Sequence, residues 1–135
     1  MIYAVIDTNV FVSALMTHNT NSATYKVAEH VLHGKIVPLY NEEIMSEYRE
    51  VLSRDYLHIS EIECHTLFEY ILKNGILTGR TTFNNLFIDE DDRVFYEVAL
   101  TKDDSFLVTG NLKHYPIEPR VVTPAQMLQI LENSN

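Results

Sequence analysis

Oxygen-bearing side chains recur beside apolar runs at four separate places in this chain. They are Asp7 with Asn9 after the run 2–6, Glu47, the block Asp89 to Asp92, and Asn111 after the run 107–109. Carboxylate and amide oxygens gathered from strand ends and helix starts suit a hard divalent cation. A cation held in this way can polarise a phosphate and lower the pKa of bound water, which points to phosphodiester chemistry.

Strands that alternate with helices are the elements that must position these side chains. Runs of β-forming residues predict strands over 2–6, 36–40, 106–109 and 121–122. Helical spacing and capping residues predict helices that follow Ser22, Asn41, Ser60, Asp91 or Asp92, and Thr123. Residues 76–86 are predicted to be a loop, with or without a short strand. This alternation implies β-α-β units and therefore an α/β fold with a central parallel sheet.

The candidate residues are expected to meet at one edge of that sheet. In an open parallel sheet the functional crevice lies beyond the carboxyl ends of the strands. Asp7 and Asn9 follow the first strand, and Asn111 follows the strand 106–109. Asp92 lies at a helix start that can face the same crevice.

Glu47 is the glutamate of its helix best placed to point inward. At about 100° per residue it borders the apolar stripe, whereas the other glutamates lie farther round the helix. The stripe consists of Ile44, Tyr48, Val51 and Leu52. A partly buried carboxylate is costly unless it is protonated, paired or bound to a metal. Beside the other acids, metal binding fits best.

Each of these positions also has a simple structural interpretation. Asp7, Asn9 and Asn111 are residue types that end strands and form turns. Glu47 suits the boundary of an amphipathic helix, and the block Asp89 to Asp92 suits a solvated loop and N-cap. The metal hypothesis rests on the order of the residues and their shared edge, not on any one of them.

Length and composition indicate one soluble globular domain. The 135 residues are 46% hydrophobic and 21% charged, and no apolar run approaches the roughly 20 residues of a membrane span. The first residues read as a strand, not as a signal peptide, and Cys64 is the single cysteine. A cytoplasmic location is therefore expected, with no disulfide and no membrane contact.

The net charge of −9 argues against ordinary nucleic-acid binding, which relies on clustered Lys and Arg. Cations bound at the block Asp89 to Asp92 would cancel part of this charge, and an acidic surface can equally recruit a basic protein. His30 and His33 form a weak zinc pair without a nearby acid. No Gly-rich phosphate loop occurs, which excludes P-loop and dinucleotide sites.

Several motifs together resemble the PIN-domain family, in the branch described as toxin components of toxin–antitoxin systems. The similarity runs nearly end to end. The motifs are Ile6-Asp7-Thr8-Asn9-Val10-Phe11, Glu47-Tyr48-Arg49-Glu50-Val51-Leu52, the block Asp89 to Asp92, Leu107-Val108-Thr109-Gly110-Asn111, and Lys113-His114-Tyr115-Pro116. The resemblance implies a three-layer α/β/α sandwich with a parallel sheet, in a single PIN-like domain over residues 1–135.

The resemblance also implies an endoribonuclease that depends on Mg²⁺ or Mn²⁺ and hydrolyses RNA phosphodiester bonds. Asp7, Glu47 and Asp92 match the metal-binding acids of the family, and Asn111 falls where many relatives hold a fourth acid. Asn9, Thr109 and Asp89 match supporting positions. The implied partners are RNA, a small antitoxin protein and a second copy of the chain in a homodimer.

Two alternatives stay open at this stage. Asn111 supplies no charge to offset a second cation, so one tightly held ion is the safer prediction, and a non-catalytic PIN-like module that binds RNA or protein is possible. A phosphatase with Asp7 as nucleophile is the less favoured alternative, because such enzymes commonly place an acid where this chain has Asn9.

Overall fold

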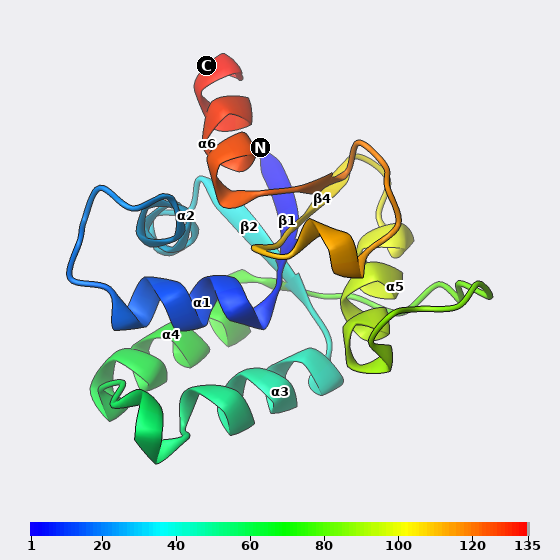
Figure 1. Cartoon of the computed structure of the whole chain (residues 1–135). Coiled ribbons are helices and arrows are strands. Elements are labelled where there is room, and N and C mark those ends of the chain that lie inside the picture. The colour runs from blue at the N-terminus through cyan, green and yellow to red at the C-terminus, as the bar shows by residue number, and fades with distance from the viewer. Residues whose placement is uncertain (135) are drawn as a thin grey trace.

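Five parallel strands form one central sheet in the order β3-β2-β1-β4-β5 (Figure 1). The computed structural model describes residues 1–134. The strands are β1 (Ile2–Ile6), β2 (Ile36–Tyr40), β3 (Ile76–Leu77), β4 (Ser105–Val108) and β5 (Val121–Val122). Every pairing is parallel. The predicted α/β fold with a parallel sheet is confirmed.

Helices cover both faces of the sheet, which makes the architecture a three-layer α/β/α sandwich (Figure 1). They are α1 (Thr8–Met16), α2 (Ala23–Leu32), α3 (Glu42–Leu52), α4 (Glu61–Asn74), α5 (Arg93–Thr101) and α6 (Pro124–Asn133). Helix α2 packs against α6 and β2, and α5 packs against β1 and β4. Helices α3 and α4 contact each other below α1 in the view of Figure 1.

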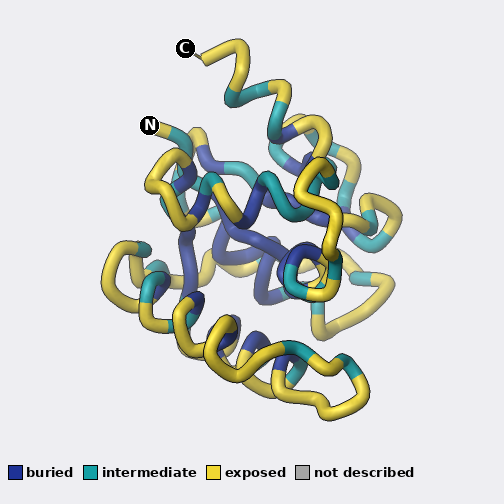
Figure 2. Tube along the Cα trace, turned by 90° about the vertical axis from the view of Figure 1, so that its left-hand side faces the viewer, coloured by how far each residue is buried: buried dark blue, intermediate teal, exposed yellow. Residues whose placement is uncertain are grey.

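Strand β1 lies in the middle of the sheet, and Figure 2 shows buried segments gathered in the centre of the molecule. Ala4, Val5 and Ile6 have no exposed surface, which explains why the strand is nearly continuous in apolar residues. Its register with β4 pairs Ile6 with Val108. The residues that follow this pair, Asp7 and Thr109, therefore leave the sheet side by side at its carboxyl edge.

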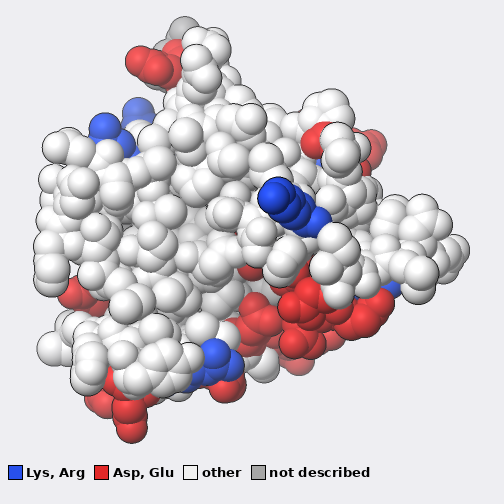
Figure 3. Space-filling view, in the orientation of Figure 1, with Lys and Arg blue, Asp and Glu red and all other residues white. Residues whose placement is uncertain are grey.

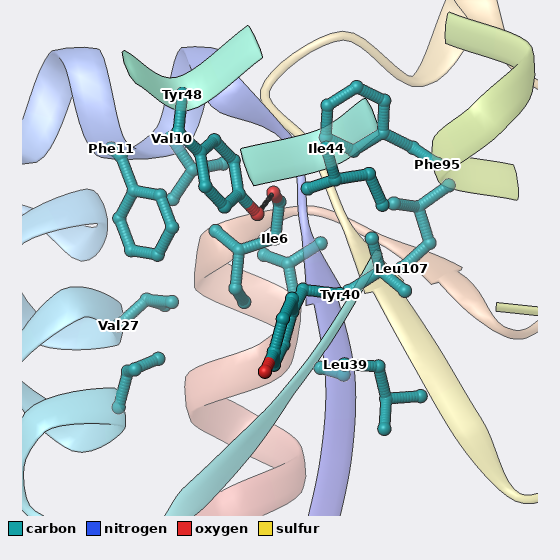
Figure 4. Close-up of a cluster of buried hydrophobic side chains, with 14 of the residues drawn as sticks. Ile6, Val10, Phe11, Val27, Leu39, Tyr40, Ile44, Tyr48, Phe95 and Leu107 are labelled. Carbon is teal, nitrogen blue, oxygen red and sulfur yellow. Dashed lines mark hydrogen bonds between the residues drawn. The ribbon is translucent and has the colours of Figure 1, made fainter. Parts of the chain in front are cut away.

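Tyr48 fastens α3 to the end of β1. Its ring meets Phe11 of α1 edge-on at a centroid distance of 5.1 Å and lies 6.3 Å from Phe95 of α5 (Figure 4). Its hydroxyl donates a hydrogen bond to the carbonyl oxygen of Ile6, the last residue of β1. The helix that carries Glu47 is thus anchored directly beside the edge where Asp7 emerges.

Two local details differ from the sequence-based expectation. Residues 8–16, for which no element is predicted above, form α1 directly after β1. The capping role expected of Asp91 or Asp92 is only partly correct: Asp92 occupies the N-cap position of α5, but its side chain makes no capping hydrogen bond. A 3₁₀ turn over Glu90–Asp92 precedes the helix, and Asp89 caps that turn by accepting a 3.0 Å hydrogen bond from the amide of Asp91.

Cys64 of α4 is buried, and its Sγ lies 3.7 Å from the carbonyl oxygen of Leu52 at the end of α3. None of the helices within residues 1–134 combines the length and the hydropathy needed to span a bilayer.

Candidate metal centre

Asp7 is a buried carboxylate held by three side-chain donors. Its Oδ2 atom accepts hydrogen bonds from Thr109 Oγ1 at 2.8 Å, the Tyr115 hydroxyl at 2.9 Å and Asn9 Nδ2 at 3.3 Å. Burial raises the pKa of Asp7, and the hydrogen bonds from Thr109 and Tyr115 oppose that rise. Burial and the nearby charge of Asp7 raise the pKa of Tyr115, so its hydroxyl stays protonated and donates.

Glu47 turns toward the same edge from α3. Its carboxylate accepts a hydrogen bond from the hydroxyl of Thr8, the first residue of α1. Burial raises the pKa of Glu47, and the negative charges of Asp7 and Asp92 raise it further. Glu42, Glu43 and Glu50 are exposed. The helical periodicity therefore selected the inward-facing glutamate of α3 correctly.

Asp92 is paired with a histidine that sequence reasoning did not select. Its Oδ2 lies 2.9 Å from Nδ1 of His114, and Nε2 of His114 lies 3.0 Å from Nδ2 of Asn111. Burial, followed by the charge of Asp7, raises the pKa of Asp92 to about 6, although the hydrogen bond with His114 acts in the opposite direction. His114 therefore orients Asp92 and Asn111 at once.

Hydrogen bonds continue from this pair back to Asp7. The backbone amide of Asn111 donates to Thr109 Oγ1 at 3.0 Å, and the same oxygen donates to Asp7. Asn9 Oδ1 accepts from the amide of Gly110 at 3.0 Å and so joins the segments that follow β1 and β4. Asn9 and Thr109 thus hold the two chain segments together at the carboxyl edge.

Within residues 1–134, one set of three acidic or histidine side chains lies within reach of a single ion. The ligand atoms of Asp89, Asp92 and His114 all lie within 4.8 Å of one another. Asp7 and Glu47 are not members of this set. The charge of Asp7 raises the pKa of Asp92, and the charges of Asp7 and Asp92 raise the pKa of Glu47. Asp92 is accordingly the residue shared by the tight set and by the predicted acids.

The chemistry of these donors fits a hard divalent cation. Asp7, Glu47 and Asp92 each have a pKa above the ordinary value, and each of these shifts includes burial. A bound cation would offset the repulsion among the ionised carboxylates and favour their charged forms. Figure 3 shows acidic side chains gathered at the lower right, in the region of α3 and the start of α5.

A family model described as PIN domain matches residues 3–113, which include every acid and amide considered above. This chain belongs to the PIN-domain family. PIN domains are generally metal-dependent nucleases that act on RNA, so membership supports a hydrolase with a divalent-metal site. His114 and Tyr115 lie just beyond the matched segment, in the motif Lys113-His114-Tyr115-Pro116 quoted above.

The PIN-domain chain also resembles an uncharacterized protein of Methanocaldococcus jannaschii. The two are 31% identical over 147 aligned residues, which cover 97% of this chain and 92% of the relative. The similarity therefore spans the whole fold and not the metal centre alone. No solved structure matches the chain significantly.

Proposed function

We propose that this chain is a metal-dependent endoribonuclease and the toxin of a toxin–antitoxin pair. The observation that carries the proposal is the chain of hydrogen bonds from Asp92 through His114, Asn111 and Thr109 to the buried carboxylate of Asp7. Asp92 also belongs to the set with Asp89 and His114 whose ligand atoms lie within 4.8 Å of one another. Each of the three acids has its own donors: Thr109 and Tyr115 for Asp7, Thr8 for Glu47, and His114 for Asp92. Partly buried acids of this kind are costly to the fold, which supports a role in binding a cation.

In this proposal Asp7, Glu47 and Asp92 hold one Mg²⁺ or Mn²⁺ ion. The bound ion supplies a Lewis acid that polarises the scissile phosphate and lowers the pKa of the attacking water. Thr109 and Tyr115 keep the Asp7 carboxylate fixed, and Thr8 fixes that of Glu47, which orients the water. Water adds to phosphorus as the bond to the 3′ oxygen breaks, which leaves a 5′-phosphate and a 3′-hydroxyl.

The direct test of the proposed function is RNA cleavage by the purified chain. Single-stranded or structured RNA should be cleaved in Mg²⁺ or Mn²⁺, and chelator should stop the reaction. Asp7→Asn should lower cleavage by at least about a hundredfold, because it removes the charge that binds and fixes the ion. Ser46→Ala, on the exposed side of α3, is the matched control and should keep full activity. Equal cleavage by Asp7→Asn would refute the site assignment.

The toxin role follows from the family resemblance and requires a test in cells. Expression of the chain should arrest growth, and Asp7→Asn should not. Co-expression of a small protein encoded beside the chain should restore growth. That small protein should co-purify with the chain. Cleavage of RNA in vitro without any effect on growth would support the nuclease activity and reject the toxin role.

Asn111 favours a second candidate, a non-catalytic PIN-like module that binds RNA or protein. Its amide adds no negative charge where relatives hold an acid, and its Nδ2 atom lies against His114. This candidate predicts weak metal affinity and no cleavage. Titration calorimetry with Mn²⁺ separates the two, because tight binding that is lost in Asp92→Ala requires a functioning metal centre.

A further inference from the structure

A pocket lies directly beside the candidate metal centre. It encloses about 270 Å³, and its lining includes His114 and Tyr115. His114 also contacts Asp92, and the Tyr115 hydroxyl donates to Asp7. A group seated in this pocket is therefore adjacent to any phosphate bound at the acids.

The walls of the pocket are apolar and largely aromatic. The rings of Phe83 and Tyr115 both meet Phe87 edge-on, at centroid distances of 5.7 and 5.9 Å. Leu86 and Ile88 stand at the mouth with 95% and 75% of their surface exposed. A ligand that covers these two side chains removes apolar surface from water, which favours binding.

The loop that carries the apolar wall is already held in place. Arg93 donates to the carbonyl oxygens of Phe83 and, at 2.9 Å, of Asn85, and its guanidinium lies 4.9 Å from the centroid of the Phe87 ring. Glu90 accepts from Nε of Arg93 at 2.7 Å. A pocket fixed in this way loses little conformational entropy when a ligand enters.

The shape and charge of the surroundings select the kind of ligand. The acids from Asp89 to Asp92 repel a phosphate that no cation accompanies, whereas a nucleobase is uncharged. The volume lies slightly below the roughly 300–1,000 Å³ of sites for drug-sized ligands, so it suits one planar ring system. Unpaired bases bind proteins by stacking on aromatic and apolar side chains.

We propose that this pocket, here termed the base pocket, receives one unpaired nucleobase of an RNA whose neighbouring phosphate lies at the metal centre. The proposal rests on the proposed nuclease function, since the metal centre places that phosphate. Cleavage then requires a single-stranded nucleotide on one side of the scissile bond. Duplex RNA, whose bases stay stacked, is cut poorly.

The first experiment moves one abasic ribonucleotide through a single-stranded RNA of mapped cleavage position. One position beside the scissile bond should lower kcat/KM about tenfold or more, the effect of a lost stacked base. Abasic nucleotides elsewhere should change kcat/KM by less than about twofold, because they contact no pocket. Equal rates for all positions would overturn the base pocket and leave the nuclease intact.

The second experiment removes the apolar mouth of the pocket in the double variant Leu86→Ser/Ile88→Ser. Both side chains are exposed, so the fold should persist, which thermal unfolding verifies. The variant should cut intact RNA about tenfold more slowly and should cut the sensitive abasic RNA at the wild-type rate. Ile62→Ser, 79% exposed on α4, is the matched control and should behave as wild type on both RNAs. An equal loss on both RNAs would contradict the proposal.

The third experiment separates the pocket from nuclease activity. Adenosine and uridine, which carry no phosphate, are titrated into metal-free protein and followed by amide chemical shifts. Shifts confined to residues 83–88 and 114–117 support the pocket even when no RNA is cleaved, a result that would reject the proposed function alone. Cleavage without such shifts and without an abasic effect rejects the pocket alone. If both RNA tests are negative and Leu86→Ser/Ile88→Ser disrupts a complex with another protein, then Leu86 and Ile88 belong to a protein interface instead.

Discussion

At the scale of single residues, Asp7 carries the strongest sign of function. A carboxylate with 4% of its surface exposed is unfavourable in charged form unless donors surround it. Thr109, Tyr115 and Asn9 provide those donors, all to the same oxygen. The other carboxylate oxygen accepts no side-chain hydrogen bond within residues 1–134, so in the proposed site it is the atom that would bind the cation.

We expect Tyr115→Phe to weaken metal binding by about tenfold, as is typical when a group that orients a ligand is lost. The substitution removes one of the donors that stabilise the ionised form of Asp7, so the pKa of Asp7 rises and a cation meets more competition from protons. Titration calorimetry with Mn²⁺ at pH 7 measures the change. Tyr40→Phe, in β2, leaves the hydrogen bonds of Asp7 intact and is the control. Unchanged affinity would show that Tyr115 acts only in packing.

At the scale of elements, α3 and α5 present Glu47 and Asp92 to the strand end that carries Asp7. The hydrogen bond from Tyr48 to Ile6 attaches α3 to β1. The rings of Phe11 and Phe95 both pack against the ring of Tyr48. The position of Glu47 is therefore set by the residue that follows it, whose side chain is fully buried. A core contact and a proposed metal ligand share one turn of helix.

We expect Tyr48→Phe to lower the free energy of unfolding by about 1–2 kcal/mol, because the carbonyl oxygen of Ile6 loses its buried partner. Urea unfolding measures this change. Tyr56→Phe, at a position with 68% exposure, is the matched control and should stay within about 0.5 kcal/mol of wild type. A Tyr48→Phe protein as stable as the control would mean that water satisfies Ile6 and that packing alone positions α3.

At the scale of the whole molecule, the acids of the candidate metal centre also contribute to the negative net charge of the protein. The chain has a net charge of −9, and the largest group of acids on the face shown in Figure 3 lies at the lower right, with others scattered elsewhere. Such a surface repels RNA until cations bind to it. Metal binding should therefore govern the affinity for RNA as well as the chemistry.

The pH dependence of stability should reveal the crowded acids in the metal-free protein. The pKa of Asp92 rises from 3.8 to about 6 on folding, so the folded protein binds its proton more tightly than the unfolded chain does. This group's contribution is therefore fully present below about pH 4 and is lost as the pH rises through about 6. The free energy of unfolding of wild type, relative to Asp92→Asn, should fall across that window. Urea unfolding at pH 4, 5, 6 and 7 in chelator provides the comparison.

The control for the pH prediction is Asp55→Asn, which changes an exposed acid. This variant should run parallel to wild type at every pH. Mn²⁺ at about a hundred times its dissociation constant should add about 2.7 kcal/mol to wild type at pH 7 and much less to Asp92→Asn. A wild-type curve parallel to that of Asp92→Asn would show that Asp92 does not have a raised pKa.

Periodicity and residue type along the chain determined most of the fold. Strands β1 and β2, helices α2, α3 and α4, and the inward orientation of Glu47 all follow from apolar spacing and capping residues. These features are local, since each depends on neighbours within one or two turns. Helix α1 was not predicted, because it begins with Thr8 and Asn9, residue types that favour turns over helix interiors. Metal binding by Asp7, Glu47 and Asp92 stays a prediction.

Only the tertiary structure decided which side chains surround the acids. His114 meets Asp92 across 22 positions of sequence, and Tyr115 meets Asp7 across 108. Contacts of this kind depend on the register of β1 with β4 and on the path of the chain after β4. No periodic pattern within one element reports on that path. The sequence therefore names the acids and their common edge, whereas the packing of distant segments supplies the donors that tune them.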